Sequence, residues 1–527
     1  MNALPPSGLA SQPSRGAPST ARTWAIAAAL LGLSLLAFIA SNPWFAVLDD
    51  ETTIAVAASQ PVSQTLSLFL AGTGQHWHPP LSDLLLHGWL RLGGGESLTA
   101  LRLPSVLLYL AALALLAQVG KHLAGPRAVL PVVVLGVLSP HAFHFARLAG
   151  WSAWCFFLIA ALSLAYIRWQ QQASAARATV LALVGLTLVA SNYLGWALLA
   201  LLLLDAWRHG TPARAARRQV LALATLFTVA ALPLFPAAMG LLEPGSAWPR
   251  WTLGTVLNTA YSLFVLIASE AVAPWYWRWS LPAGVAVAGS LGLGWRYAPP
   301  LARRLMAYAF VLLLLLALLG ALNTKRLLIL MPWVVLPLGT ALVCAPLRQR
   351  QGLAMALLVI GALGWLGTLT RAHYASMHFV EPWRELAAQT TPAVRAGAVV
   401  LTNSRPFSFE LHQALMREDP SAPAPRMPGY AQGDRVRSYF EAPIDALDFL
   451  RGAPDVRHVV GVQHGIDDDE RVTAWLEAHC LRVGGARLVE DAGHALKQRW
   501  FPKHGQRRWR VELMRYDCTQ AAGATAN

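Results

Sequence analysis

Charged side chains are scarce in this sequence. Only 13% of its 527 residues are Asp, Glu, Lys or Arg, whereas a soluble domain carries roughly a quarter of its residues in these four types. Hydrophobic residues make up 55% of the chain. This composition excludes an ordinary soluble protein and predicts a membrane protein before any motif is considered.

Other common signals are also missing. The sequence contains no glycine-rich nucleotide-binding fingerprint and no internal repeat. Cysteine is rare, with four residues in all. Two of them, Cys480 and Cys518, lie in the polar C-terminal part of the chain, where their spacing alone leaves a disulfide between them open.

Acidic residues are fewer than basic ones. The chain has 27 of the former and 42 of the latter, which gives a net charge of +15. In a soluble protein this charge would suggest binding to nucleic acid. In a membrane protein the cytoplasmic loops collect Lys and Arg to fix the orientation, so we expect no nucleic-acid partner.

The sequence does contain a series of long apolar runs. Residues 1–22 form a basic tail that we expect to be disordered, because it is rich in Pro, Ser, Ala and Gly. Roughly 20 apolar residues are needed to cross a bilayer. Eleven runs of about this length or somewhat shorter predict a helical membrane domain over residues 23–371: 23–40, 103–119, 128–146, 151–167, 178–191, 193–206, 219–239, 281–295, 305–322, 327–345 and 353–370.

The distribution of positive charge predicts how this bundle is oriented. Alternate connections are rich in basic residues, and the positive-inside rule assigns them to the cytoplasm: Lys121, Arg127, Arg168, Arg177, Arg208, Arg214, Arg217, Arg218, Arg296, Arg303, Arg304, Arg348 and Arg350. The remaining connections carry mainly Arg91, Arg147, Arg250, Arg278, Lys325 and Arg326. We therefore expect a multi-pass protein of a bacterial inner membrane, with the loop 42–101 and the whole C-terminal part outside the cytoplasm.

The composition changes at about residue 371. In residues 372–527 the segments GAVVLTNS, DVRHVVGVQHG and WRVELMRYD have the pattern of strands, whereas SFELHQALM, IDALDFLRG and DERVTAWLEAHC have helical periodicity. Alternating strands and helices favour a small α/β domain. We predict a periplasmic domain of this class.

The first outer loop carries an acidic cluster. Asp49, Asp50 and Glu51 follow the first run directly and have apolar residues on both sides. Carboxylates at a membrane surface are costly to desolvate and indicate function. The alternative is a solvated loop or the N-cap of a following helix.

The same loop continues with two histidines and two short amphipathic segments. His76 and His78 flank a tryptophan in HWHPPL, so they are candidate ligands for a divalent metal beside the acids. The segments SLFL and LSDLLLHGWLRL predict short helices that lie on the membrane. Metal binding is left open by a single pair of histidines.

Taken together, an acidic Asp-Glu after the first span, then HPPL, then G-x-E-x-x-x-x-LRLPS, resemble the GT-C glycosyltransferases, and in particular glycosyltransferase family 39 and its relatives. That superfamily holds protein O-mannosyltransferases, lipid A aminoarabinose transferases and galacturonosyltransferases of the lipopolysaccharide core. The resemblance covers the chain to about residue 371. It is strongest over residues 49–105 and again at NTKRLLILMPW.

The resemblance implies an inverting glycosyltransferase that uses a sugar linked to undecaprenyl phosphate. The family's acidic pair falls on Asp50 and Glu51, so Asp50 is the expected catalytic base, with Asp49 as the competing candidate. A positioned carboxylate can take the proton of the acceptor hydroxyl, for a rate gain of about 10²- to 10⁴-fold. His78 in HPPL is a candidate substrate contact, and Arg102 in LRLPS is expected to hold the loop to the second span.

Basic residues are needed for the phosphate that leaves. The family's pattern places this role on Arg326, with Lys325 beside it; the alternative is a pair that snorkels to the interface. His144 and Arg147 are further candidates, although the Arg-x-Tyr that relatives carry nearby is replaced here by Gly150 and Ser152. The four aromatic residues around Arg278 fit an interfacial belt or a surface for stacking on sugar.

These features favour an interfacial enzyme that transfers the sugar to a lipid, glycan or protein acceptor. The competing hypothesis is an inactive scaffold of the same fold or a transporter of lipid-linked sugar. Transporters usually place their ionisable groups near the middle of the bilayer. Here the notable charges lie at the predicted outer surface.

Overall fold

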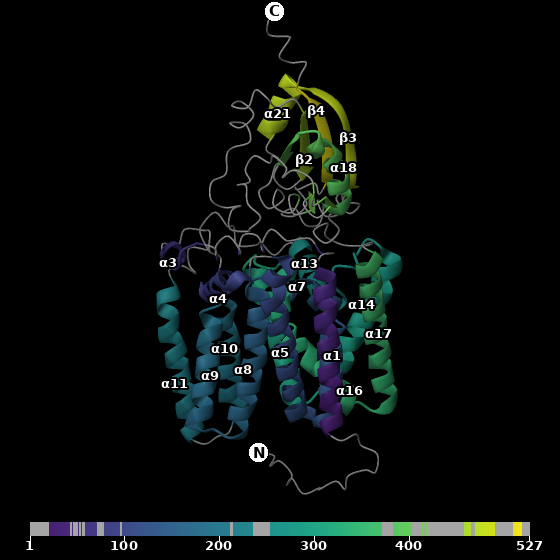
Figure 1. The fold of residues 1–527 in the computed structure, drawn as a ribbon. Helices are drawn as coiled ribbons and strands as arrows, with labels where there is room; N and C mark the ends of the chain where they lie inside the picture. Colours follow the sequence, from purple (N-terminus) through teal and green to yellow (C-terminus); the bar gives the residue numbers. More distant parts are fainter. Residues whose placement is uncertain are drawn as a thin grey trace, which may run out of the picture.

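A helical bundle and a small sheet domain make up the molecule (Figure 1). The computed structural model describes residues 20–42, 60–70, 78–94, 97–210, 214–235, 253–370, 383–402, 458–464, 470–490 and 510–518, together with residues 45, 51, 54, 58, 411, 414, 415, 418, 419 and 421. Asp49, Asp50 and His76, and the segment IDALDFLRG, lie outside the described residues. So does most of SFELHQALM.

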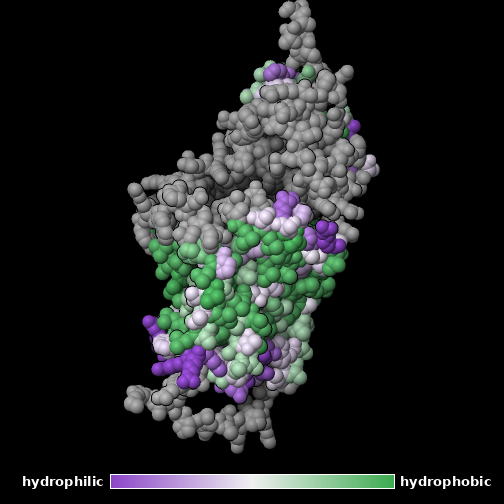
Figure 2. Space-filling model, turned by 90° about the vertical axis from the view of Figure 1, so that its left-hand side faces the viewer, coloured by the Kyte–Doolittle hydropathy of each residue, from purple (hydrophilic) through white to green (hydrophobic). Residues whose placement is uncertain are grey.

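The bundle follows the apolar runs of the sequence. Its helices are α1 (Thr20–Ser41), α5 (Leu98–Ala124), α6 (Val129–Val137), α7 (Pro140–Phe145), α8 (Trp151–Gln171), α9 (Ala175–Val189), α10 (Leu194–His209), α11 (Arg214–Ala231), α13 (Leu253–Ala268), α14 (Trp277–Tyr297), α15 (Pro300–Leu318), α16 (Pro332–Cys344) and α17 (Leu347–Thr370). A broad apolar band crosses the face of the bundle that Figure 2 shows. The protein is therefore a multi-pass membrane protein.

Six of these helices are long and apolar enough to cross a membrane by themselves. Shorter apolar helices, such as α9 and α16, account for others of the predicted runs. The count of eleven spans stays a prediction. Helix α13 was not among the predicted elements, since Thr255, Asn258, Thr259 and Ser262 interrupt its apolar residues.

One predicted span is broken into two helices. α6 ends at Val137 and α7 begins at Pro140, because proline lacks the N–H that a continuing helix would need. Ser139 caps α7 by accepting a hydrogen bond from the N–H of Ala142. The break turns the chain at the point where the candidate residues His144 and Arg147 follow.

The outer loop contains the two short helices that its amphipathic segments predict. They are α3 (Val62–Leu70) and α4 (Leu81–Trp89), which continues into the π-helical turn η2 (Leu90–Gly94). Both helices lie at the end of the bundle that faces the sheet domain (Figure 1). We call this the sheet end and the opposite one the far end.

The C-terminal domain has a four-stranded mixed sheet in the order β1-β2-β4-β3. β1 (Val399–Thr402) pairs in parallel with β2 (His458–His464), which is antiparallel to β4 (Arg510–Asp517), and β4 is antiparallel to β3 (Leu481–Glu490). The helices α18 (Trp383–Arg395) and α21 (Glu470–His479) accompany the sheet. The predicted α/β class is confirmed, although β3 and α18 were not predicted.

The two parts of the molecule pack on each other. Leu98, at the start of α5, contacts the core that Leu386, Val400, Val460 and Leu513 form in the sheet domain. The sheet end therefore includes the outer loop, the beginning of α5 and the C-terminal domain. Glu51 of the acidic cluster lies at this end, where it pairs with Arg102 of α5.

Candidate functional site

A buried ion pair fixes Glu51, the last residue of the acidic cluster, to the bundle. Glu51 accepts hydrogen bonds from Nε and Nη2 of Arg102, at 2.8 and 2.7 Å, and both side chains are fully buried. Its Oε1 also accepts the backbone N–H of Ala149 at 2.9 Å. Both carboxylate oxygens of Glu51 are thus engaged, so this residue holds the loop in place.

Arg102 gathers the chain on both sides of the two aspartates. Its Nη1 donates to the backbone carbonyls of Asn42 and Phe45, each at 3.2 Å. A single guanidinium therefore binds Phe45 before the aspartates and Glu51 directly after Asp50. The expected structural role of Arg102 agrees with these contacts.

Three consecutive residues at the junction of α7 and α8 each contact the outer loop. Ala149 donates its N–H to Glu51, Gly150 packs against Ile54, and the ring of Trp151 lies 4.4 Å from that of His78. His78 in turn lies beside Asn192 in the turn between α9 and α10, with its Nδ1 3.5 Å from the amide nitrogen. The junction between α7 and α8 therefore contacts the outer loop at Glu51, Ile54 and His78.

Gly150 explains the departure from the family pattern. A Cβ added to it would lie 2.7 Å from Cδ1 of Ile54, and its φ of +152° is one that side chains rarely adopt. A larger residue at this position, such as an arginine, would have to adopt this strained φ and move the end of the Ile54 side chain.

Arg147 is buried in an aromatic cage. Its guanidinium lies over the rings of Phe38, Phe45 and Phe143, at 5.3, 3.9 and 4.2 Å from their centroids. Nε donates to the carbonyl of Phe143 and Nη1 to the hydroxyl of Ser41. Because cations gain from aromatic faces when desolvated, this cage keeps a positive charge at the sheet end.

His144 connects α7 to α17. Its Nε2 lies 3.3 Å from the hydroxyl of Thr368, and its ring meets that of Phe45 edge to face at 5.1 Å. One turn earlier, His141 is fully buried, and neither of its ring nitrogens has a hydrogen-bond partner among the described residues. His141 was not among the candidates of the sequence analysis, because its burial depends on how the helices pack.

Lys325 and Arg326 lie on the 3₁₀ turn η5 (Thr324–Ile329), which packs against α7, α8 and α13. Both side chains are partly exposed. Nη1 of Arg326 donates to the carbonyl of Ala321 at 2.8 Å, and Asn323 caps the turn. The structure thus brings this pair to the elements that carry His144 and Arg147.

A second buried carboxylate at the sheet end was not predicted. Glu270 is 7% exposed and follows Ser269, whose φ of +76° is the one positive φ among the non-glycine residues that the structure describes. Strained backbone of this kind tends to occur at functional sites. The aromatic run from Trp275 onward had drawn attention to the segment, but not to this acid.

No group of three or more His, Cys, Asp and Glu that could hold a metal occurs in the described part of the chain. Asp49, Asp50 and His76 lie outside it. The metal hypothesis stays open.

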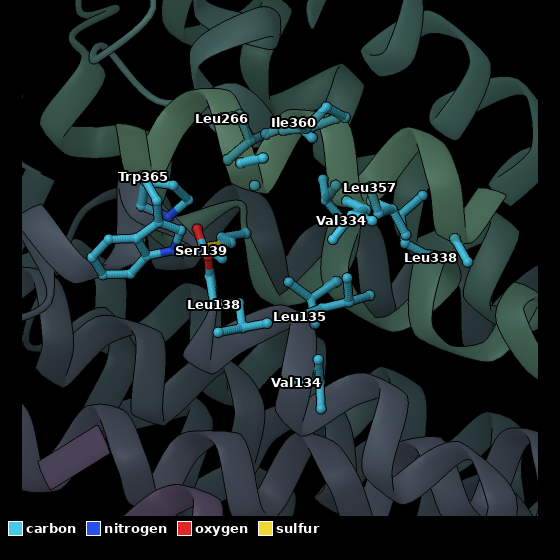
Figure 3. A pocket seen from close by; sticks show the side chains of 18 of the residues that line it. Val134, Leu135, Leu138, Ser139, Leu266, Val334, Leu338, Leu357, Ile360 and Trp365 are labelled. Atoms are coloured by element: carbon cyan, nitrogen blue, oxygen red, sulfur yellow. Dashed lines mark hydrogen bonds between the residues drawn. The ribbon is translucent and has the colours of Figure 1, made fainter. Parts of the chain in front are cut away.

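An apolar cavity of about 400 Å³, partly open to the outside of the bundle, lies next to α7. The cavity is lined by α6, α13, α16 and α17 (Figure 3). Near one end of it, Nε1 of Trp365 donates a hydrogen bond to the carbonyl of Leu138 at 2.7 Å (Figure 3). Ser139 and Pro140 belong to its wall and also begin α7. Such a space suits a hydrocarbon chain.

No protein-family model and no curated protein matches the sequence. Among solved structures, ArnT from Cupriavidus metallidurans bound to undecaprenyl phosphate is 12% identical, with a TM-score of 0.52 over 94% of this chain and 98% of that one. The apo state of ArnT gives the same values. The arabinofuranosyltransferase AftD from Mycobacteria is 19% identical, with a TM-score of 0.44 over 95% of this chain and 40% of that one.

Proposed function

We propose that this chain, which has the GT-C fold of a membrane glycosyltransferase, is an inverting enzyme that transfers a sugar from a polyprenyl-phosphate donor. The GT-C fold expected from the motifs of the outer loop is confirmed. The observation that carries the proposal is the binding of Arg102 to both Phe45 and Glu51. This contact supports a fixed position for Phe45 and Glu51, the described residues on either side of Asp49 and Asp50 in the sequence.

Asp50 is the proposed catalytic base. The oxygen of an acceptor hydroxyl attacks the anomeric carbon while the bond from that carbon to the phosphate oxygen breaks, which inverts the configuration. Asp50 takes the hydroxyl proton, and the polyprenyl phosphate leaves with the bonding electrons. Because both oxygens of Glu51 are engaged with Arg102 and Ala149, Glu51 is the positioning residue.

Positive charge at the sheet end would stabilise the leaving phosphate. Lys325 and Arg326 are the proposed phosphate contacts, since η5 packs against α7 and α8. Arg147 contributes a buried positive charge from the turn that follows α7, and His144 and His78 are the further proposed substrate contacts. Such charges act strongly where water is excluded.

The cavity is the proposed site for part of the lipid carrier. Along α17 its lining runs from Ala354 to Trp365, which corresponds to about 16 Å at a rise of about 1.5 Å per residue. ArnT, the structure with the same fold, was solved with undecaprenyl phosphate. A chain in this cavity would reach α7 and the basic residues near it.

The proposed location is a bacterial inner membrane, with the sheet end in the periplasm. Cys480 and Cys518 form a disulfide, which supports an oxidising compartment for the sheet domain. Most of the basic residues predicted to be cytoplasmic lie in the bundle helices, near the helix ends at the far end (Figure 1). These observations support the orientation expected from the charge distribution.

The decisive test supplies radiolabelled polyprenyl-phosphate sugars and membrane acceptors to the purified protein. We expect Asp50→Asn to lower transfer by about 10²- to 10⁴-fold and Asp49→Asn, its neighbour of identical chemistry, to lower it much less. Equal transfer by Asp50→Asn and wild type would refute the assignment of the base. Loss in Asp49→Asn alone would move the role by one residue.

The same assay separates the competing hypotheses. An inactive scaffold would transfer no sugar from any donor tested. A transporter would instead move the labelled donor across proteoliposome membranes without a transfer product. Activity that disappears in chelator and returns with a divalent ion would establish a metal requirement.

A further inference from the structure

The far end of the bundle contains an unusual buried acid. Asp205, on α10, is 2% exposed and accepts hydrogen bonds from the hydroxyls of Tyr166 and Tyr308 at 2.5 and 2.7 Å. It also pairs with Nε of Arg304 at 2.5 Å and with His209. The helix α8 begins at Trp151 in the candidate site, and Tyr166 lies near its opposite end. Asp205, which binds Tyr166, is therefore remote from the candidate site.

Positive charge around Asp205 exceeds what the carboxylate can balance. Asp205 is the sole acidic residue in the sequence between Glu96 and Glu243, and none occurs from residue 271 to residue 380. Arg208 lies within electrostatic range of Tyr308 and makes no hydrogen bond to a described residue. Arg217 lies over the ring of Trp207 at 5.5 Å.

Asp205 also orients Arg304. The carboxylate binds the Nε edge of the guanidinium, and its two Nη groups make no hydrogen bond to any residue in the described part of the chain. These groups are a planar fork, the geometry that binds phosphate oxygens in pairs. A fixed guanidinium loses less conformational entropy when it binds an anion.

The surface beside this cluster is apolar. Leu204 and Trp207 on α10 are 41% and 47% exposed, and Leu221 on α11 is 56% exposed. Figure 2 looks at the side of the bundle on which α9, α10 and α11 lie in Figure 1, and hydrophilic residues gather along the lower edge of its apolar band. A ligand here would meet both a phosphate site and a hydrocarbon surface.

We propose that Arg208, Arg217 and Arg304 form a binding site for the phosphate of an anionic phospholipid in the leaflet at the far end. Its acyl chains lie on Leu204, Trp207 and Leu221. The positive-inside rule accounts for exposed arginines in this region. The rule does not require a buried carboxylate such as Asp205, which is held by two tyrosines and orients Arg304.

The test measures lipid binding rather than sugar transfer, so it is independent of the proposed function. The full-length protein in phosphatidylcholine nanodiscs is titrated with dioleoyl phosphatidylglycerol, and binding is followed by native mass spectrometry and by the thermal shift. Arg208→Gln with Arg217→Gln is compared with Arg296→Gln with Arg348→Gln. The control removes two exposed arginines of the predicted cytoplasmic side, one of them stacked on Tyr297 as Arg217 is on Trp207.

At about fivefold per basic residue, the first pair should weaken binding of phosphatidylglycerol about 25-fold, whereas the control pair should stay close to wild type. Should the first pair not fold, Arg217→Gln alone should show the single fivefold loss. Equal losses in both pairs would overturn the proposal in favour of a diffuse field. So would the same stabilisation by inorganic phosphate, or by added phosphatidylcholine, in place of phosphatidylglycerol.

Discussion

At the scale of single residues, Arg102 is the most consequential side chain of the candidate site. It pairs with Glu51 while fully buried, and it also holds two backbone carbonyls of the loop. Removing one partner of a buried ion pair leaves an uncompensated charge, which costs about 3–5 kcal/mol. We expect Arg102→Ala to lower the thermal stability of the purified protein by an equivalent amount and to abolish transfer.

A double variant separates the charge from the packing. In Glu51→Gln with Arg102→Met no buried charge stays without its partner, so stability should recover in part. Transfer should stay low, since the loop has lost its anchor. If the double variant were as unstable as the sum of the two single variants, the ion pair would not be the interaction that matters.

The effect of a substitution at Gly150 can be offset by a second substitution at Ile54. Gly150→Ala should destabilise the protein by about 1–3 kcal/mol, because both its φ and its distance from Ile54 disfavour a Cβ. Ile54→Val removes the Cδ1 atom that the new methyl group would strike. The pair should therefore lose less in a thermal unfolding series than the two single variants added together; strictly additive losses would show that the contact is not the cause.

At the scale of elements, α17 positions the loop that bears Glu270. A Cβ on Gly367 would lie 2.3 Å from the carbonyl oxygen of Ala271, a backbone atom that cannot easily move. The hydroxyl of the next residue, Thr368, is hydrogen-bonded to Nε2 of His144. Gly367→Ala should consequently lower both the melting temperature and the rate of transfer.

Gly352 provides the matched control for that change. It lies on the same helix outside the cavity, and a Cβ there would lie 4.0 Å from its nearest neighbour, Cδ1 of Leu293, which is an ordinary contact. Gly352→Ala should be neutral or slightly stabilising, because alanine favours helix by about 1 kcal/mol over glycine. Similar losses from both substitutions would mean that helix propensity, rather than the packing on Ala271, decides the outcome.

Comparison of these elements with the sequence shows which features a pattern can predict. The apolar runs placed most bundle helices, and alternating residues placed β1, β2 and β4, since burial acts on every residue of such segments. β3 escaped notice because its residues Leu481–Glu490 include Gly484 and Gly485 and are mostly exposed. Its strand form depends on pairing with β4.

The candidate site shows the same division. The acidic loop and the basic pair Lys325–Arg326 were identifiable, because charges beside apolar runs stand out. Glu51 accepts a hydrogen bond from the N–H of Ala149, 98 residues away. This contact could not be predicted, because a backbone donor has no sequence signature. The pairing of Asp205 with Arg304, 99 residues apart, likewise requires the packed bundle.

At the scale of the whole molecule, the sheet domain and the bundle form one structure whose two ends differ. Leu98 packs into the core of the sheet domain, and the same helix carries Arg102 one turn later. The sheet domain thus contacts the helix that anchors Glu51. We infer that loss of the domain's fold would disturb the start of α5 and the anchor of the loop.

The disulfide makes this connection testable. Cys480 and Cys518 close a loop with a sequence separation of 38, joining the end of α21 to the end of β4. A disulfide typically stabilises by about 2–4 kcal/mol. Cys480→Ser should lower the melting temperature of the sheet domain and reduce transfer, and reduction of the wild type by dithiothreitol should have the same effect.

Cys155→Ser, which removes a buried thiol of the bundle that has no disulfide partner, should leave the response to dithiothreitol unchanged. A wild-type protein whose stability and transfer are both insensitive to dithiothreitol, with the bond shown to be reduced by thiol labelling, would show that the sheet domain does not depend on it.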